Sequence, residues 1–251
     1  MLSGLIVGLV VGLTGVGGGS LMTPLLVLAF GVQPATAVGT DLLYASVTKS
    51  VGTLVHGFNR NIDWRITALL ASGSLPASFA TIAVLGRIGP FGPQTAIVIT
   101  KSLGCALLLT AAAMFARRRI TAFIAAHGSP APQRLRGVLT ILAGALLGLF
   151  VSISSVGAGA LGVTALVVLY PQAPTSRIVG SDIAHAVPLT LVAGLGHWLI
   201  GSVQLGTLGL LLCGSIPGII AGSILAPRLA DWGLRTALGS VLFVVGLRLV
   251  I

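Results

Sequence analysis

The chain has 251 residues, of which 55% are apolar and only 7% are charged, whereas a soluble globular domain carries about 25% charged residues. Fourteen lysines and arginines stand against four aspartates, and the formal net charge is +10. So few charges exclude a soluble fold and indicate an integral membrane protein, and they do not indicate nucleic-acid binding, because most arginines occupy short gaps between apolar runs.

Apolar runs follow one another along the whole chain, and each is long enough to cross a hydrocarbon core of about 30 Å. They lie at 1–31, 34–58, 65–86, 91–116, 136–170, 174–200, 204–226 and 232–251. The first has no basic start or clear cleavage site, so we interpret it as a membrane segment rather than a signal peptide. The first and fifth runs are too long for one crossing, and small residues interrupt each of them, at 15–20 and 152–159. We predict that each is a hairpin of two short helices.

The two halves of the chain are related in sequence. Gly39-Thr40-Asp41 returns as Gly180-Ser181-Asp182, 141 positions later, and the same shift carries His56 onto His197. The two breaks align with a shift of 140, which requires one inserted residue, placed near Arg177. We therefore predict a first transmembrane repeat at 1–116, a polar Arg/Pro-rich loop as a linker at 117–135, and a second transmembrane repeat at 136–251.

The arginines favour one orientation of these repeats. If the hairpins enter the membrane and return, the repeats are inverted, and nearly all loop arginines fall on the cytoplasmic side with Arg87 outside. If each hairpin crosses once, the repeats are parallel and the arginines divide between the two sides. The positive-inside rule favours the inverted arrangement. The predicted fold is an all-α polytopic membrane protein with two inverted repeats, each a broken helical hairpin followed by three transmembrane helices, and with a cytoplasmic 117–135 loop.

The glycine-rich breaks are the first candidate site. Unwound backbone at membrane depth must line a cavity or be buried in protein. A helix that restarts after a break offers N–H groups and a positive dipole end to a small anion. Equivalent breaks in two repeats therefore indicate a midplane anion site. Its backbone donors would come from Gly17, Gly18 and Gly19, and from Gly157 and Gly159. The alternative is close helix packing through small residues, to which we assign most other glycines.

Ionisable residues inside the apolar runs are the second candidate. Asp41 and Lys49 lie eight residues apart, on nearly the same face of a helix. Lys49 is the proposed counter-charge for an anion, with a lysine that extends to the interface as the alternative. Lys101 is a weaker second cation.

Asp41 and Asp182 serve either in proton coupling or as caps near the start of their helices. Among the histidines, His56 and His197 lie near segment ends, where interface positions are common. His185 lies one turn after Asp182, a spacing at which the two side chains can make contact.

Enzyme chemistry has little support in this sequence. The carboxylates are dispersed, no Gly-x-Ser-x-Gly motif occurs and no zinc-protease spacing is present. Cys105 and Cys213 lie in apolar runs without metal-ligand spacing and are interpreted as packing residues. We therefore expect no catalytic residues, no metal and no cofactor.

Two stretches of the first half carry a family resemblance. Residues 12–26, with Gly17-Gly18-Gly19-Ser20, and residues 37–52 through to His56 resemble the TauE/SafE family of sulfite and organosulfonate permeases. The size and duplication also fit that family over essentially the whole chain. The resemblance implies a carrier in the bacterial cell inner membrane for sulfur-containing anions, usually an exporter. The second half departs from the motif, with Ala158 in place of Gly18 and Thr190 in place of Lys49, so an asymmetric site is expected.

The expected function is export of a small anion such as sulfite or an organosulfonate, by alternating access around the midplane site. Hydroxyl groups would join the break N–H groups and Lys49 in binding it: Thr14, Ser20, Thr40, Ser154 and Ser155. An anion channel, a carrier of a different small anion, and a membrane-embedded enzyme or assembly subunit are the alternatives. The expected partners are the anion and the lipid bilayer. The sequence leaves open the energy source, as proton coupling or membrane potential, and the oligomeric state, with a homodimer as one option.

Overall fold

The computed structural model describes residues 2–14, 19–58, 61–89, 92–127, 132–225 and 231–251, and these residues form ten α-helices and no strand. For some helical residues only the backbone is described. The helices are α1 (Leu2–Thr14), α2 (Gly19–Leu28), α3 (Pro34–Phe58), α4 (Trp64–Ile88), α5 (Pro93–His127), α6 (Gln133–Ser154), α7 (Ala160–Leu169), α8 (Thr175–Leu199), α9 (Leu205–Leu225) and α10 (Asp231–Val250).

The protein is a multi-pass membrane protein. Five helices are long and apolar enough to cross a bilayer: Trp64–Ile88, Pro93–Arg117, Gln133–Ser154, Thr175–Leu199 and Leu205–Gly222. Of these, α8 is the most enclosed, with 61% of its window inside the protein against 28% to 39% for the others. The helix α3 is not among the five, because polar residues interrupt its apolar pattern.

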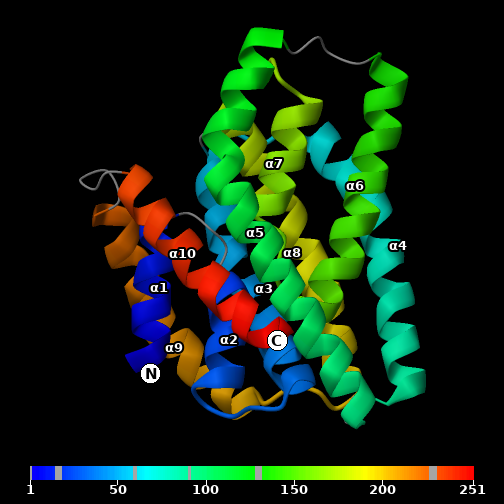
Figure 1. The fold of residues 1–251 in the computed structure, drawn as a ribbon, viewed down its shortest axis with the longest axis vertical. Coiled ribbons are helices and arrows are strands. Elements are labelled where there is room, and N and C mark those ends of the chain that lie inside the picture. Colours follow the sequence, from blue (N-terminus) through cyan, green and yellow to red (C-terminus); the bar gives the residue numbers. More distant parts are fainter. Residues whose placement is uncertain (1, 15–18, 59–60, 90–91, 128–131, 226–230) are drawn as a thin grey trace.

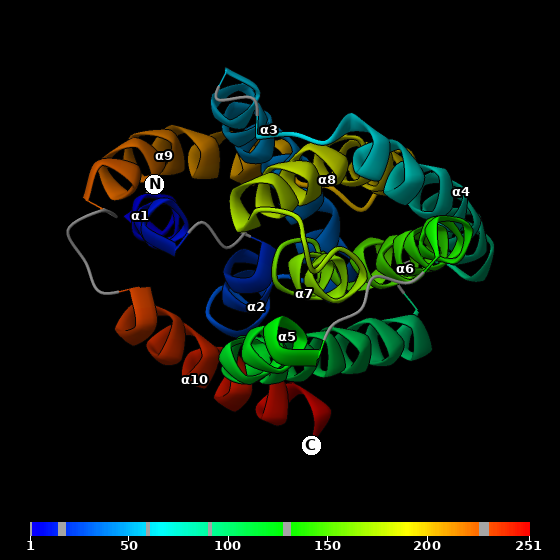
Figure 2. The same cartoon turned by 90° about the horizontal axis from the view of Figure 1, so that it is seen from above.

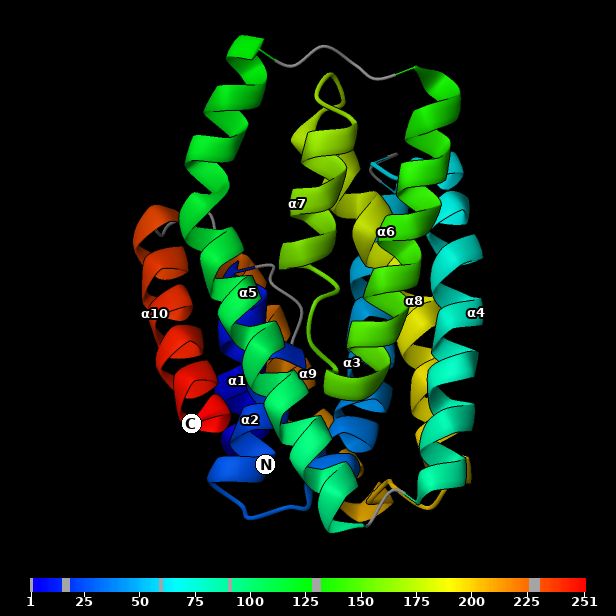
Figure 3. The same ribbon diagram turned by 45° about the vertical axis from the view of Figure 1, so that its right-hand side comes forward.

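Each of the two long apolar runs contains two helices, α1 and α2 in the first and α6 and α7 in the second, as predicted. Figure 3 shows α6 running down the molecule and α7 returning toward the end from which α6 came. The first helix of this pair is not short, because α6 has 22 residues whereas α7 has 10. At 1.5 Å per residue α6 extends over about 33 Å, enough to cross a bilayer alone. The prediction of two short helices was therefore wrong for the second hairpin.

The described break between α6 and α7 depends on left-handed backbone. Ser155 has φ of 60°, and Gly157 and Gly159 have φ of 124° and 126°. Glycine adopts such angles without the steric cost that a Cβ would bring. These two glycines let the chain stop one helix and start the next within five residues.

The helices pack in reciprocal pairs between the halves. The first helix of each half packs against the fourth of the other, as α1 with α9 and α6 with α4, while α3 packs against α8 and α5 against α10. Figure 2 shows the short helices α2 and α7 between the α3/α8 pair and the α5/α10 pair. The halves are therefore interlocked rather than side by side, and both contribute to the interior.

Equivalent glycines lie at the contacts of the α1/α9 and α4/α6 pairs. A Cβ on any of them would overlap the backbone of the facing helix. The pairs are Gly4 with Leu211, Gly8 with Ser215, Gly144 with Leu70, and Gly148 with Ser74. This close approach confirms the packing role that the sequence assigned to glycines outside the breaks.

Helix bounds place the inserted residue of the second half. The residue numbers of the packing glycines in α1 and α6 differ by 140, whereas those of the first residues of α3 and α8 differ by 141. The loops before α3 and α8, residues 29–33 and 170–174, are equally long. The extra residue therefore lies in the 149–160 region that contains the second break. The prediction that placed it near Arg177 was wrong.

Much of the predicted linker is helical. Helix α5 has 35 residues and continues to His127, and α6 begins at Gln133, so residues 117–127 and 133–135 belong to helices. The Thr121 hydroxyl donates to the Arg117 carbonyl, within the extended helix. An Arg- and Ala-rich sequence favours helix once it leaves the apolar run, so this stretch is not the polar loop that the sequence suggested. The two cysteines are both exposed rather than packed in the core.

Candidate functional site

The interior around the α3/α8 pair holds a group of buried polar side chains that an apolar core does not need. Its members come from both halves and from the second break: Thr40, Asp41, Lys49, Ser152, Ser154, Ser155, Asp182, His185 and His197. We call this group the polar layer. Because buried polar groups are costly without partners, the partners of each residue show what it does.

Asp41 is the eighth residue of α3, so it does not cap its own helix, as one interpretation of the sequence had it. Its side chain is fully buried, and Oδ2 accepts a hydrogen bond of 2.5 Å from Thr23 Oγ1 on α2. The Ser155 side chain of the second break lies close by. Neither Asp41 Oδ1 nor Ser155 Oγ has a hydrogen-bond partner in the described structure.

Asp182 holds the equivalent place, as the eighth residue of α8, and it too lies beyond the first turn of its own helix. Its carboxylate packs against Gly162 so closely that a Cβ on that glycine would overlap Oδ1. The backbone N–H of Gly159, at the start of α7, lies next to the same carboxylate. Asp182 therefore sits at the positive end of α7, where an anion is stabilised, although neither of its oxygens has a hydrogen-bond partner that meets normal geometry.

Lys49 links the two aspartates. It is 9% exposed, and Nζ donates a hydrogen bond of 3.1 Å to the Ala158 carbonyl in the second break. Both carboxylates act electrostatically on its ammonium group, that of Asp182 more strongly than that of Asp41. A lysine that extends to the membrane interface would be exposed at its tip, so the alternative interpretation is wrong. By contrast Lys101, the weaker second cation, is exposed.

The histidines of α8 are held by serines. His185 Nε2 lies 2.7 Å from Ser74 Oγ of α4, and its Nδ1 has no partner. His185 makes no hydrogen bond to Asp182, one turn before it, since neither Asp182 oxygen accepts a hydrogen bond in the described residues. His197 is 1% exposed and its Nε2 lies 2.9 Å from the Ser152 carbonyl, so it is enclosed by protein, and it lies two residues before the end of α8.

The predicted hydroxyl ligands divide into two groups. Ser154 Oγ donates to the Phe150 carbonyl and accepts from the Val156 N–H, so it closes the end of α6. Thr40 Oγ1 accepts from the Gln204 backbone N–H, which ties α3 to the start of α9. Ser155, the remaining described hydroxyl of this set, is buried and makes no hydrogen bond of normal geometry. It lies beside the Asp41 carboxylate, where a ligand could compete for it.

The first break contributes less to this picture. Gly17 and Gly18 lie outside the described residues. Thr14, Gly19 and Ser20 belong to α1 and α2, and His56 belongs to α3, but their side chains and surroundings also lie outside the described part. The site can therefore be built from the second break, where Gly157 and Gly159 form the turn that brings Ser155 and Ala158 to α3.

Sequence reasoning missed three residues that hold the polar layer in place: Thr23, Ser74 and Ser152. A signal for Ser74 was present, because it belongs to the Gly-Ser-x-Pro motif of residues 73–76 that returns at 214–217. The two copies have matching roles. Ser74 contacts His185, and Ser215 lies next to Tyr44, the residue 141 positions before His185. The repeated motif therefore marks where α4 and α9 support the central helices.

Known proteins resemble this chain over its whole length. Residues 1–249 match the family model described as "Sulfite exporter TauE/SafE". The probable membrane transporter protein YjnA of Bacillus subtilis (strain 168) is 38% identical over 251 residues, which cover 100% of this chain and 98% of that protein. The probable membrane transporter protein MJ0441 of Methanocaldococcus jannaschii is 27% identical over 97% of this chain and 91% of its own length. No solved structure matches.

Proposed function

The chain belongs to the sulfite exporter TauE/SafE family and is a membrane transporter, not an enzyme, and from this we propose that it exports a small sulfur-containing anion such as sulfite or an organosulfonate. The family description supports the sulfur chemistry. The polar layer supports the place where the anion binds, since it is the part of the described interior that combines a cation, unpartnered hydroxyl and carboxylate groups, and a broken helix.

One observation carries this proposal: Lys49 of the first half donates to the backbone of the second break. A buried ammonium group is costly and by default marks a pathway. Its hydrogen bond to a carbonyl of unwound backbone is one that an oxyanion can replace. The anion would then lie between Lys49, Ser155 and the start of α7, with contacts to both halves, so that a rearrangement of one half against the other changes access to it.

We further propose that the two repeats are inverted, around an axis in the membrane plane. The hairpin α1–α2 opens toward the end of the molecule that holds loops 29–33 and 200–204, whereas α6–α7 opens toward the opposite end (Figure 1). Arg65, Arg134, Arg136 and Arg177 belong to helix starts at that opposite end. The positive-inside rule then makes it the cytoplasmic side, in a bacterial inner membrane. Arg87 belongs to the last turn of α4, at the outer end.

Charge balance favours the binding of a proton together with the anion. Lys49 already has two carboxylates as neighbours, so an additional anion would bring three negative groups to one positive group in a buried site. Such an arrangement is costly unless a carboxylate binds a proton. Protonation of Asp41 or Asp182 on anion binding would remove this repulsion, and the proton would then cross the membrane together with the anion, with the anion gradient as the driving force for export.

Flux measurements with matched lysine variants test the proposal. Purified protein in proteoliposomes should move sulfite or a short sulfonate such as sulfoacetate at a rate that saturates with concentration. Lys49→Ala should abolish most of this flux, whereas Lys101→Ala, which removes an exposed lysine, should retain it. Equal flux in both variants would remove Lys49 from the site.

The alternatives predict different results from the same preparation. An anion channel would give electrical currents larger than any carrier can produce. A carrier of a different anion would respond to sulfate, thiosulfate or another ion of the screen but not to sulfite or sulfonates. The absence of flux with every small anion would exclude the carrier.

A further inference from the structure

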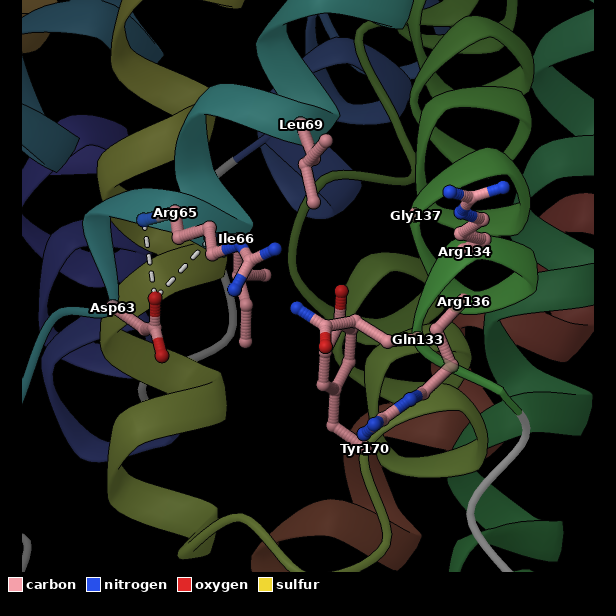
Figure 4. Close-up of a pocket in the computed structure, with 9 residues that line it drawn as sticks. All are labelled: Asp63, Arg65, Ile66, Leu69, Gln133, Arg134, Arg136, Gly137 and Tyr170. Atoms are coloured by element: carbon pink, nitrogen blue, oxygen red, sulfur yellow. Dashed lines mark hydrogen bonds between the residues drawn. The ribbon is translucent and has the colours of Figure 1, made fainter.

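A second cluster of polar residues lies at the end of the molecule where α4 and α6 begin. A cavity of about 710 Å³ lies between the starts of α4 and α6 and the residue that follows α7, a size typical of ligand sites, which measure roughly 300–1,000 Å³. Figure 4 shows that Arg65 of α4, Gln133 and Arg136 of α6, and Tyr170 extend into a shared space. Arg134 also lines the cavity.

Neutral groups hold two of these arginines. The Arg136 guanidinium lies 5.8 Å from the centre of the Tyr170 ring, and the Tyr170 hydroxyl is fixed in turn by Thr140 Oγ1 at 2.9 Å. With its amide oxygen turned toward Arg65, Gln133 accepts from both terminal nitrogens of that guanidinium, at 3.0 and 2.8 Å. The side chains are thus positioned without their charge being neutralised.

The available carboxylates do not balance this charge. Of the described lining residues Asp63 alone is acidic, and its Oδ1 accepts from the backbone N–H groups of Arg65 and Ile66 as the cap of α4. The chain has only four acidic side chains, and Asp41 and Asp182 are buried in the polar layer. Three arginines therefore share one carboxylate that is already engaged. Arg136 Nε is buried with no partner, and the first turn of α6 has no side-chain cap.

Comparison of the two halves argues against a role in folding alone. Because the halves pack reciprocally, a residue needed only for packing should recur at the equivalent position. Arg65 corresponds to Gly206, Asp63 to Gln204 and Tyr170 to Ala29, each 141 positions apart. These three lining residues are therefore not repeated in the other half. The positive-inside rule accounts for arginines at this end of the molecule, but not for their position around one cavity, which a ligand explains.

We propose that this cavity binds an oxyanion group, a phosphate, sulfate or sulfonate, through the guanidinium groups of Arg65 and Arg136. A planar guanidinium binds two oxygens of such a group at once, and the uncapped start of α6 adds N–H donors. The oxyanion belongs either to a free ion in solution or to the phosphate of an anionic lipid at the membrane surface. The inference stands apart from the proposed function, because no residue of the polar layer lines the cavity.

Two double variants with equal loss of charge test this site. Arg65→Gln/Arg136→Gln removes both cavity guanidiniums, whereas Arg87→Gln/Arg248→Gln removes two exposed arginines elsewhere. Binding of inorganic sulfate and phosphate is measured by calorimetry in uncharged detergent, at constant ionic strength and in a Lys49→Ala background, so that the polar layer does not contribute. Retention of phosphatidylglycerol from mixed nanodiscs, measured by native mass spectrometry, forms the lipid arm.

The double variant of the cavity, Arg65→Gln/Arg136→Gln, should lower the affinity about tenfold or more in one of the two measurements, a loss of about 1.4 kcal/mol. The control double variant should change the affinity less than twofold. The arm that responds identifies the source, a free oxyanion or a lipid. Equal losses in the two double variants, or no loss in either arm, would overturn the inference. If the cavity pair does not fold, Arg136→Lys decides, since it keeps the charge but not the planar fork: unchanged affinity contradicts the site.

Discussion

Asp41 and Asp182 occupy the same position in the two halves, and each lies against the short return helix of its own half. Asp41 accepts from Thr23 of α2, and Asp182 packs on Gly162 of α7. The two sites differ in one hydrogen bond. Thr164, which is 141 positions after Thr23, donates to the Ala160 carbonyl of its own helix. Asp182 is therefore left without the hydroxyl partner that Asp41 has, and the pair is equivalent in place but unequal in environment.

Gly162→Ala should impair transport by displacing Asp182. The new Cβ would overlap Oδ1 of that carboxylate, and such overpacking costs about 1–3 kcal/mol. We expect the rate of anion transport in proteoliposomes to fall by about tenfold or more. Gly206→Ala is the matched control, because nothing lies within 4 Å of a Cβ there. A Gly162→Ala protein that transports at the rate of the control would show that the position of Asp182 is unimportant.

Thr23→Val should weaken the support of Asp41. Valine has nearly the shape of threonine but lacks the donor, so the Asp41 carboxylate would lose its one recorded hydrogen bond. Hydrogen bonds inside membrane proteins contribute about 0.6 to 1.7 kcal/mol, and the free energy of unfolding in mixed micelles should fall by about this amount. Thr23→Ser, which keeps the hydroxyl, should unfold like the parent protein, and equal stability of the valine variant would contradict the contact.

Gly148→Ala should destabilise the protein, although alanine favours helices. In α6 the methyl group would overlap the backbone of Ser74 on α4. In an open helical position alanine is better than glycine by about 1 kcal/mol, so Gly209→Ala, with nothing within 4 Å, should be neutral or slightly stabilising. Thermal unfolding of the two variants in detergent should therefore move in opposite directions. A rise for both would mean that α4 and α6 are not in close contact.

Single cysteines should report the two ends of the molecule. Cys105 and Cys213 are exposed and must first be replaced by serine. Gln133→Cys at the start of α6 and Gln33→Cys before α3 then place one thiol at each end. A membrane-impermeant maleimide applied to whole cells should label position 33 and not position 133, and lysed cells should show both labelled. The reverse pattern would overturn the proposed orientation, and labelling of both in whole cells would contradict opposite sides.

The sequence by itself determined the helices, their membrane character and the duplication. These properties are local or periodic: the length of an apolar run measures a crossing, and a motif that returns after 141 positions gives the repeat. The same reasoning found Lys49, Asp41, Asp182 and both breaks, because charge and glycine are exceptional inside an apolar segment. It overestimated the loop between the halves, since the helix of α5 continues where the apolar pattern stops.

Only the tertiary structure decided which of these residues meet. Spacing along a helix shows on which side of that helix a side chain lies, but it does not show which residues of other helices it contacts. Lys49 and Ala158 are 109 positions apart, and their hydrogen bond exists because α3 of one half packs against α8 and the break of the other. For the same reason the two aspartates lie against other helices instead of capping their own. The basic cavity likewise combines the starts of α4 and α6, whose arginines have no common motif, because interlocked packing brings them to one end of the molecule.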